Sequence, residues 1–332
     1  MSDPRLRTLN NGYPVFPIPP MFDMYGALDL DETRKYVTYL EDHGARVFMT
    51  TQGTSQFDLL EDDEIVALNI AVAEVTNCDV IMGVPNRLSF IRNGCVDALL
   101  EVASRRRRSA GSEREDTINT ALMYLYPGRY YGDGSEMVSW LFEQANYCDK
   151  HKIPVLVHGM WMRGGTGGIV DFPTKNIIDI GSHRNIIGMK EETRSIDSAM
   201  SILASVEDAL GPYPHDRFDI IVAGGSMRRF NALRNGYRVK TWLTGVGNII
   251  PEIEAWYGNN HDRKEMLEAE KHFFETTKKI GWHLSLREGL RLAGVAKFSD
   301  RQPFPYCSEE QRAELQEAID RVVRVVNGVL DE

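Results

Sequence analysis

The sequence predicts a (β/α)8 TIM barrel that carries a small helical subdomain at its C-terminal end. Eight short apolar segments recur along the chain with helical segments between them. Apolar runs without polar alternation are typical of strands buried on both faces, as in parallel sheets. Eight such strands alternating with helices favour a closed barrel, and an open doubly wound sheet is the alternative if one or two strands are miscounted.

The elements follow one another in a regular order. A helix near residues 31–43 is amphipathic, and Asp31 is a fair N-terminal cap for it. Turn residues and helical segments separate the strands that follow. The eight predicted strands are residues 13–18, 46–50, 80–84, 121–126, 154–158, 185–190, 219–223 and 240–244.

The C-terminal part of the chain has more helix than is needed to close a barrel. Residues 262–279, 285–292 and 308–329 are predicted to be helical, and Ser308 with Gln311 forms a capping box. We therefore divide the chain into a barrel, residues 1–258, and a helical subdomain packed on it, residues 259–332.

Composition excludes several classes of protein. The formal net charge of -10 argues against a general nucleic-acid binder. No apolar run approaches 18 residues and no signal peptide is evident, so we expect no membrane contact. The cysteines lack CxxC spacing, which predicts neither a disulfide framework nor a zinc site and suits the cytoplasm. The basic run 105–108 is interpreted as the solvated end of a helix.

Lys190 is the residue that most directly suggests chemistry. It ends the apolar segment 185–190, where an unpaired ammonium would be costly to bury. A neutral, desolvated amine at such a place is a nucleophile for carbonyl compounds. The alternative is a lysine that reaches solvent or pairs with Glu191, Glu192 or another acid.

Other candidate residues follow the ends of the predicted strands, where barrel active sites lie. Thr54 and Ser55 form a turn whose amides and hydroxyls suit a carboxylate. His158 could move a proton, and Arg163 could hold an acidic group. Tyr130, or its neighbour Tyr131, is a second acid/base candidate, although paired tyrosines usually serve packing.

The loops after the seventh and eighth strands keep a phosphorylated substrate open as an alternative. Gly224, Gly225 and Ser226 are followed by Arg228 and Arg229. These loops are the common phosphate-binding position in barrels.

Six motifs in this order resemble the dihydrodipicolinate synthase / N-acetylneuraminate lyase family. That family comprises (β/α)8 barrels that use a Schiff-base lysine on 2-oxo acids such as pyruvate. Glu64 also stands where the family's helix keeps a glutamate. The matching segments are 53–57, 163–165, 186–191, 223–226, 244–251 and 301–304.

The chain also departs from the family's pattern. His158 stands where the family's strand 5 carries a tyrosine that relays protons to the imine, and Gln56 replaces the glutamate of the turn. Residues 86–116 hold extra sequence that does not align.

The resemblance implies a lysine-dependent lyase or aldolase for a 2-oxo acid, such as pyruvate or a 2-keto-3-deoxy sugar acid. Lys190 would form the imine, so no cofactor and no metal are expected. His158 or Tyr130 would move protons. The resemblance also implies a homo-oligomer, a dimer or tetramer, and a non-catalytic binding or regulatory member is the remaining alternative. The expected substrate-binding residues are Thr54, Ser55, Arg163, Gly224, Gly225 and Leu243.

Overall fold

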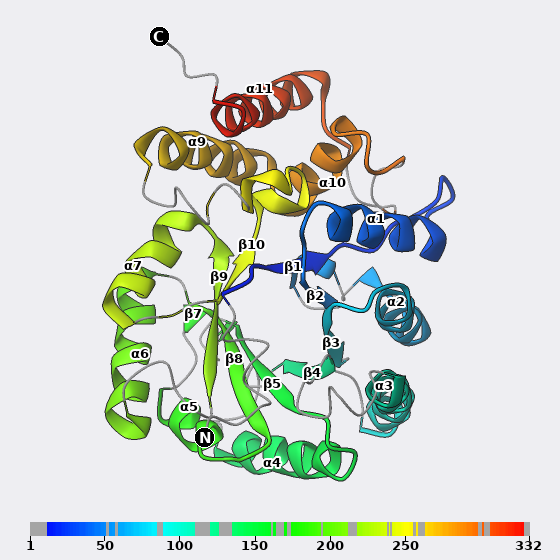
Figure 1. The fold of residues 1–332 in the computed structure, drawn as a ribbon, viewed down its shortest axis with the longest axis vertical. Helices are drawn as coiled ribbons and strands as arrows, with labels where there is room; N and C mark the ends of the chain where they lie inside the picture. The colour runs from blue at the N-terminus through cyan, green and yellow to red at the C-terminus, as the bar shows by residue number, and fades with distance from the viewer. Residues whose placement is uncertain are drawn as a thin grey trace.

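The computed structural model contains a closed barrel of eight parallel strands surrounded by helices (Figure 1). Neighbouring barrel strands follow the order β1-β10-β9-β8-β5-β4-β3-β2. The structure describes residues 12–50, 53–56, 59–84, 89–109, 120–125, 135–160, 162–163, 169–170, 174–193, 195–211, 218–237, 239, 241–254, 257, 263–297, 301 and 306–328.

All eight predicted strands are confirmed. They form the predicted closed barrel, so the open doubly wound sheet, which was the alternative, is wrong. A two-stranded antiparallel pair that the sequence did not predict, β6 (Met162–Arg163) and β7 (Ile169–Val170), follows the fifth barrel strand. The barrel strands are β1 (Val15–Ile18), β2 (Val47–Thr50), β3 (Asp79–Val84), β4 (Thr120–Leu125), β5 (Val155–Met160), β8 (Ile186–Glu192), β9 (Asp219–Gly225) and β10 (Thr241–Thr244).

Helices surround the barrel and alternate with its strands. The predicted cap of the first helix is wrong by two residues: Asp29 accepts a hydrogen bond from the amide of Glu32 at 2.9 Å, and Asp31 lies inside the first turn. An acidic residue in that turn still suits the helix dipole. These helices are α1 (Leu30–Asp42), α2 (Asp62–Val75), α3 (Ser89–Ser109), α4 (Ser135–Asp149), α5 (Thr174–Gly181), α6 (Ile196–Leu210) and α7 (Met227–Tyr237).

Three C-terminal helices lie together beside β10 and α1 (Figure 1). They are α9 (Lys264–Ile280), α10 (Trp282–Leu292) and α11 (Glu309–Val326). The capping box of Ser308 and Gln311 is confirmed. The division at residue 258 falls outside the described residues and stays a prediction. None of the helices in the described ranges is both long and apolar enough to cross a membrane.

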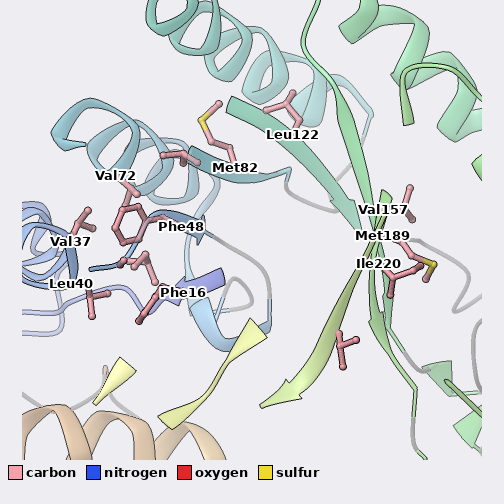
Figure 2. Close-up of a cluster of buried hydrophobic side chains, with 14 of the residues drawn as sticks. Phe16, Val37, Leu40, Phe48, Val72, Met82, Leu122, Val157, Met189 and Ile220 are labelled. Carbon is pink, nitrogen blue, oxygen red and sulfur yellow. The ribbon is translucent and has the colours of Figure 1, made fainter. Parts of the chain in front are cut away.

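The apolar core has two layers, because successive side chains of a strand point to opposite faces. One layer fills the space between strands and helices, and Figure 2 shows Phe16 and Phe48 beside Val37 and Leu40 of α1. The other layer fills the barrel interior, with Met49 and Leu156 among its members. The barrel is therefore packed inside, and space for a ligand is left at its strand ends.

A register shift in β8 decides which way Lys190 points. Ile187 belongs to the interior layer, so a strict period of two would also turn residue 189 inward. Instead, Val155 pairs with Ile186 while Leu156 pairs with Gly188, so β8 holds one extra residue at this step. Met189 consequently packs in the outer layer, and Lys190 turns into the barrel beside His158.

We expect Gly188→Ala to be strongly destabilising. A Cβ at residue 188 would lie 2.4 Å from the carbonyl oxygen of Asp219 on the neighbouring strand, and backbone cannot yield as a flexible side chain can. The expected loss of unfolding free energy is about 3 kcal/mol, measured by urea denaturation. Gly236→Ala on α7 is the matched control, because nothing lies within 4 Å of its added Cβ. Equal stability of the two variants would refute the close contact of Gly188 with the backbone of Asp219.

The basic run at the end of α3 is not a simple solvated helix end. Arg106 donates hydrogen bonds to the carbonyl oxygens of Thr76 at 2.6 Å and Cys78 at 2.7 Å, and its Nε donates to Thr120. It therefore satisfies carbonyls that follow the end of α2. Arg105 is exposed and pairs with Glu74, as expected for a surface residue. The solvated interpretation was wrong for Arg106 because a long side chain can turn back beneath its neighbours.

Candidate active site

Three charged or polar side chains meet at the carboxyl ends of β5 and β8. Oε2 of Glu192 lies 2.8 Å from Nζ of Lys190 and 2.8 Å from Nε2 of His158. Lys190 is 1% exposed and His158 is 0% exposed, whereas the side chain of Glu192 is 30% exposed. The carboxylate therefore links the two buried nitrogens to the space above the barrel.

The electrostatics of the cluster assign its charges. Burial disfavours the ionised form of Glu192, but the charge of Lys190 and the bond from His158 outweigh burial and hold the pKa of the carboxyl well below its usual range. Burial, followed by the charge of Lys190, lowers the pKa of His158 to about 4, although Glu192 acts in the opposite direction. At neutral pH the imidazole is therefore neutral, and its Nε2–H donates to the carboxylate.

The sequence predicted either a buried nucleophilic lysine or a lysine that reaches solvent or pairs with an acid. In the structure Lys190 is buried and does not reach solvent, and it pairs with Glu192. Glu191 points to the opposite side of the strand, where Nη2 of Arg229 lies 2.7 Å from its Oε1. A buried lysine with a single carboxylate partner at a strand end remains a candidate nucleophile.

The turn after β2 closes over the lysine. Gly53 has φ of +55°, and a Cβ there would lie 3.3 Å from Nζ of Lys190, so glycine allows the turn to approach the amine. Thr54 and Ser55 complete this short 3-10 helix. Oγ of Ser55 is buried without a hydrogen-bond partner among the described residues. Thr54 lines the cavity at this end of the barrel, whereas Ser55 is buried and is not among the lining residues.

A cavity of about 330 Å³ lies at the carboxyl ends of the strands. It is lined by Thr54 and Glu192 and by Leu243 and Thr244 of β10. Helices α9 and α10 contribute further lining residues, which are Phe274, Thr277, Lys278 and Trp282. The cavity has the size of a small-molecule site and places a carboxylate that contacts Lys190 on its wall.

The structure brings most of the predicted site residues to this end of the barrel. Thr54, Gly224 and Leu243 line the cavity, and Lys190 and His158 contact it through Glu192. Gly225 ends β9 next to Gly224 but is not among the lining residues.

Two of the predicted sites involve side chains that lie outside the described residues. The backbone of Arg163 lies in β6, while its side chain is outside the described residues. Tyr130 and Tyr131 also lie outside the described residues. Their assigned roles stay predictions.

The sequence interpretation named Glu192 only as a possible partner of Lys190 and did not name the aromatic residues Phe274 and Trp282. Glu192 carried a usable signal, because it stands two residues after Lys190 in a strand and so shares its face. Phe274 and Trp282 carried none, since only the packing of α9 and α10 places them over the barrel. Among the described residues, no three His, Cys, Asp or Glu side chains are grouped to hold a metal ion.

Gln56, which replaces a glutamate of the family's turn, has a structural partner. Its Oε1 accepts hydrogen bonds from Nε and Nη2 of Arg287 at 3.0 and 2.6 Å. Arg287 lies on α10, so this neutral acceptor ties the turn over Lys190 to the C-terminal helices. The side chain at residue 56 therefore serves the position of the turn.

The candidate phosphate position after β9 is already used by side chains of the protein. The amide of Met227, the first residue of α7, donates to both carboxylate oxygens of Glu270 at 2.9 Å. Arg229 is engaged by Glu191 and Thr193. A carboxylate at a helix N-terminus occupies the place where a phosphate would bind.

Fold and site together define this protein as a (β/α)8 barrel with a buried, ion-paired lysine at the end of its sixth barrel strand. No protein-family model matches the sequence, and no curated protein matches it. Solved structures of the same fold include dihydrodipicolinate synthase from Bacillus clausii, with a TM-score of 0.68 and 15% identity. The match covers 95% of this chain and 98% of that one.

Two further structures extend this comparison. The 4-hydroxy-tetrahydrodipicolinate synthase of Methylacidiphilum fumariolicum has a TM-score of 0.71 at 13% identity, covering 96% of this chain and 99% of that one. A variant of 2-keto-3-deoxygluconate aldolase from Sulfolobus solfataricus, in complex with pyruvate, has a TM-score of 0.69 at 16% identity. That match covers 96% of this chain and all of the aldolase chain. The resemblance found in the motifs is thus confirmed at the level of the fold.

Proposed function

We propose that this chain is a class I lyase or aldolase that acts on a 2-oxo acid through a Schiff base on Lys190. The observation that carries the proposal is the contact of a buried lysine with Glu192, a carboxylate that lines the cavity. The fold supports it, because the structures of similar fold include synthases and an aldolase in complex with pyruvate.

The chemistry begins with a proton transfer inside the ion pair. Oε2 of Glu192 takes a proton from Nζ of Lys190 across 2.8 Å, which leaves a neutral amine. Nζ then adds to C2 of the 2-oxo acid. The former carbonyl oxygen takes one proton from Nζ and one from Glu192 and leaves as water, which restores the carboxylate. The resulting iminium accepts the electron pair of the C3–C4 bond on cleavage, while the proton of the C4 hydroxyl passes to the carboxylate. Condensation reverses these steps.

The surrounding residues fit supporting roles. The hydroxyls of Thr54 and Ser55 and the amides of their turn would hold the substrate carboxylate, as the sequence suggested. His158 is buried behind Glu192, so we assign the proton transfer to Glu192 and give His158 the role of orienting it. Tyr130 and Arg163 keep their predicted roles as a second acid/base group and a distal anion contact.

Borohydride trapping with pyruvate is the direct test. Reduction of the imine should add a pyruvate-derived group to one lysine per chain, and peptide mapping should place it on Lys190. Intact mass gives the stoichiometry. The absence of an adduct with pyruvate and with a panel of longer 2-oxo acids would overturn the proposal and favour a non-catalytic binding protein.

Two alternatives to this proposal are a phosphorylated substrate and a non-catalytic protein. The carboxylate of Glu270 already accepts a hydrogen bond from the amide of Met227 at the start of α7, which disfavours a phosphate there. A non-catalytic member of the fold would have no need for a buried lysine beside a cavity, so trapping decides this alternative as well. Assembly into a dimer or tetramer and a cytoplasmic location remain part of the proposal.

A further inference from the structure

The cavity is lined by two chemically different groups of side chains. Glu192 and the hydroxyl of Thr54 are polar, and Glu192 contacts the buried Lys190. Phe274 of α9 and Trp282 of α10 form an aromatic wall of the same cavity. These two rings are stacked, with centroids 6.1 Å apart and planes inclined by 24°. A ligand in this cavity therefore meets both polar groups and an aromatic surface.

The aromatic wall is held in place from several sides. Gly281, with φ of +112°, ends α9 and lets the chain turn so that Trp282 begins α10 beside Phe274. Nε1 of Trp282 donates to Oγ1 of Thr54 at 3.4 Å. Arg287 further along α10 binds Gln56 of the same turn. The indole is thus fixed relative to the turn over Lys190, as a preformed binding surface requires.

The hydroxyls near this wall are already engaged. Thr277 donates to the carbonyl oxygen of Phe274 at 3.1 Å. Thr244 donates to the carboxylate of Glu254 and accepts a hydrogen bond from the amide of Gly247 at 3.0 Å. Leu243 and the glycines 224 and 245 offer no side-chain donors, so Lys278 is the cationic donor that remains among the other lining residues. A polyhydroxylated ligand would lose its hydration here without full replacement.

The volume sets the size of the ligand. The cavity of about 330 Å³ equals the liquid volume of about eleven water molecules at roughly 30 Å³ each. Pyruvate, with six non-hydrogen atoms, leaves more than half of this volume empty. A further group the size of a six-membered ring would fill the remainder against the aromatic wall.

We propose that the substrate is a 2-oxo acid whose distal half is an apolar planar group, such as a phenyl ring, rather than a polyhydroxylated sugar acid. The ring would pack against Trp282 and Phe274, where aromatic pairs gain energy beyond their buried area. The 2-oxo acid end would lie at Lys190 and Thr54. This inference rests on the proposed function for its reacting end, but the aromatic wall stands apart from that chemistry.

The test compares ligands of similar size in the intact protein. Phenylpyruvate should be trapped by borohydride at a half-saturating concentration at least about tenfold below that of pyruvate. It should also outcompete 2-keto-3-deoxygluconate, which has a hydroxylated tail. Phe274→Leu should raise the half-saturating concentration of phenylpyruvate roughly tenfold and that of pyruvate less than twofold. Tighter binding of the sugar acid would overturn the inference.

Controls separate this inference from the proposed function. Phe142→Leu is matched to Phe274→Leu, because Phe142 contacts the ring of His183 in a tilted arrangement, with centroids 4.9 Å apart, on the outside of the barrel. It should leave both ligands unchanged. Calorimetric titration with 3-phenylpropionate, which lacks the oxo group, measures the wall without imine chemistry. If 3-phenylpropionate binds but no 2-oxo acid is trapped, the aromatic wall is supported and the Schiff base on Lys190 is refuted. If pyruvate is trapped but phenyl ligands are not preferred, the Schiff base is supported and the aromatic wall is refuted as a binding surface.

Discussion

Replacing Lys190 with methionine is expected to abolish imine trapping and to lower turnover of a 2-oxo acid by roughly 10⁴-fold or more. The amine is the group that forms the covalent bond, and no other lysine of the described chain contacts Glu192 in an ion pair. Methionine matches the length of the lost side chain and fits apolar surroundings. Mass spectrometry after borohydride reduction measures the adduct, and a steady-state assay measures turnover.

The control for this variant is a lysine outside the site. Lys279 is exposed and pairs with Glu314 at 2.6 Å, so Lys279→Met should retain the full adduct and the full rate. Lys278, which lines the cavity, gives a sharper contrast. An adduct on Lys278 in the Lys190→Met protein, with turnover preserved, would show that the buried amine is not the nucleophile.

Removing Lys190 also has a structural consequence that can be measured separately. It leaves Glu192 with His158 as its hydrogen-bond partner in the cluster, and a charge that loses its counter-ion costs about 1–3 kcal/mol when partly buried. The urea midpoint should therefore fall modestly while the far-UV spectrum is kept. A loss of activity with an intact fold then reports on chemistry.

The barrel could be predicted from the sequence because its signal is local. Each strand is a short apolar run between turn residues, and burial on both faces demands such composition. Helix ends were less certain. Asp29 and Asp31 are equally good caps by residue type, and only the backbone geometry of Asp29 selects it. The start of α10 at Trp282 was missed because tertiary packing, not helix propensity, places that residue.

The candidate site could be predicted only in part, and the shift in β8 explains why. A regular strand through Ile187 would direct Met189 and Glu191 into the barrel and Lys190 toward the helices. The extra residue at Ile187 and Gly188 reverses this phase, so Lys190 and Glu192 face the cavity end. Sequence alone assigned Lys190 from its apolar neighbours. The period of two then puts Glu192, and not Glu191, on the face of Lys190, but only the shift shows that this face is turned into the barrel.

Glu192→Gln is expected to lower kcat by roughly 10²–10⁴-fold and to slow imine formation on Lys190, although the adduct still forms there after long exposure to the 2-oxo acid. Glutamine keeps the size and an acceptor oxygen for His158, but it cannot take the proton from the C4 hydroxyl. Single-turnover trapping separates the two steps, since reduction captures the imine before cleavage. A variant with wild-type kcat would remove Glu192 from the proton transfer, and a lost fold would be visible in its urea curve.

The same measurement on His158→Phe distinguishes the two members of the cluster. His158 is 0% exposed and neutral at pH 7, with its Nε2–H directed at Glu192, so its removal should disturb the position of the carboxylate without removing the base. We expect a loss of about tenfold in kcat, smaller than that of Glu192→Gln. If the order is reversed, His158 moves the proton as the sequence first suggested. The ratio of the two effects therefore assigns the base, because only one of these side chains reaches the cavity that would hold the substrate.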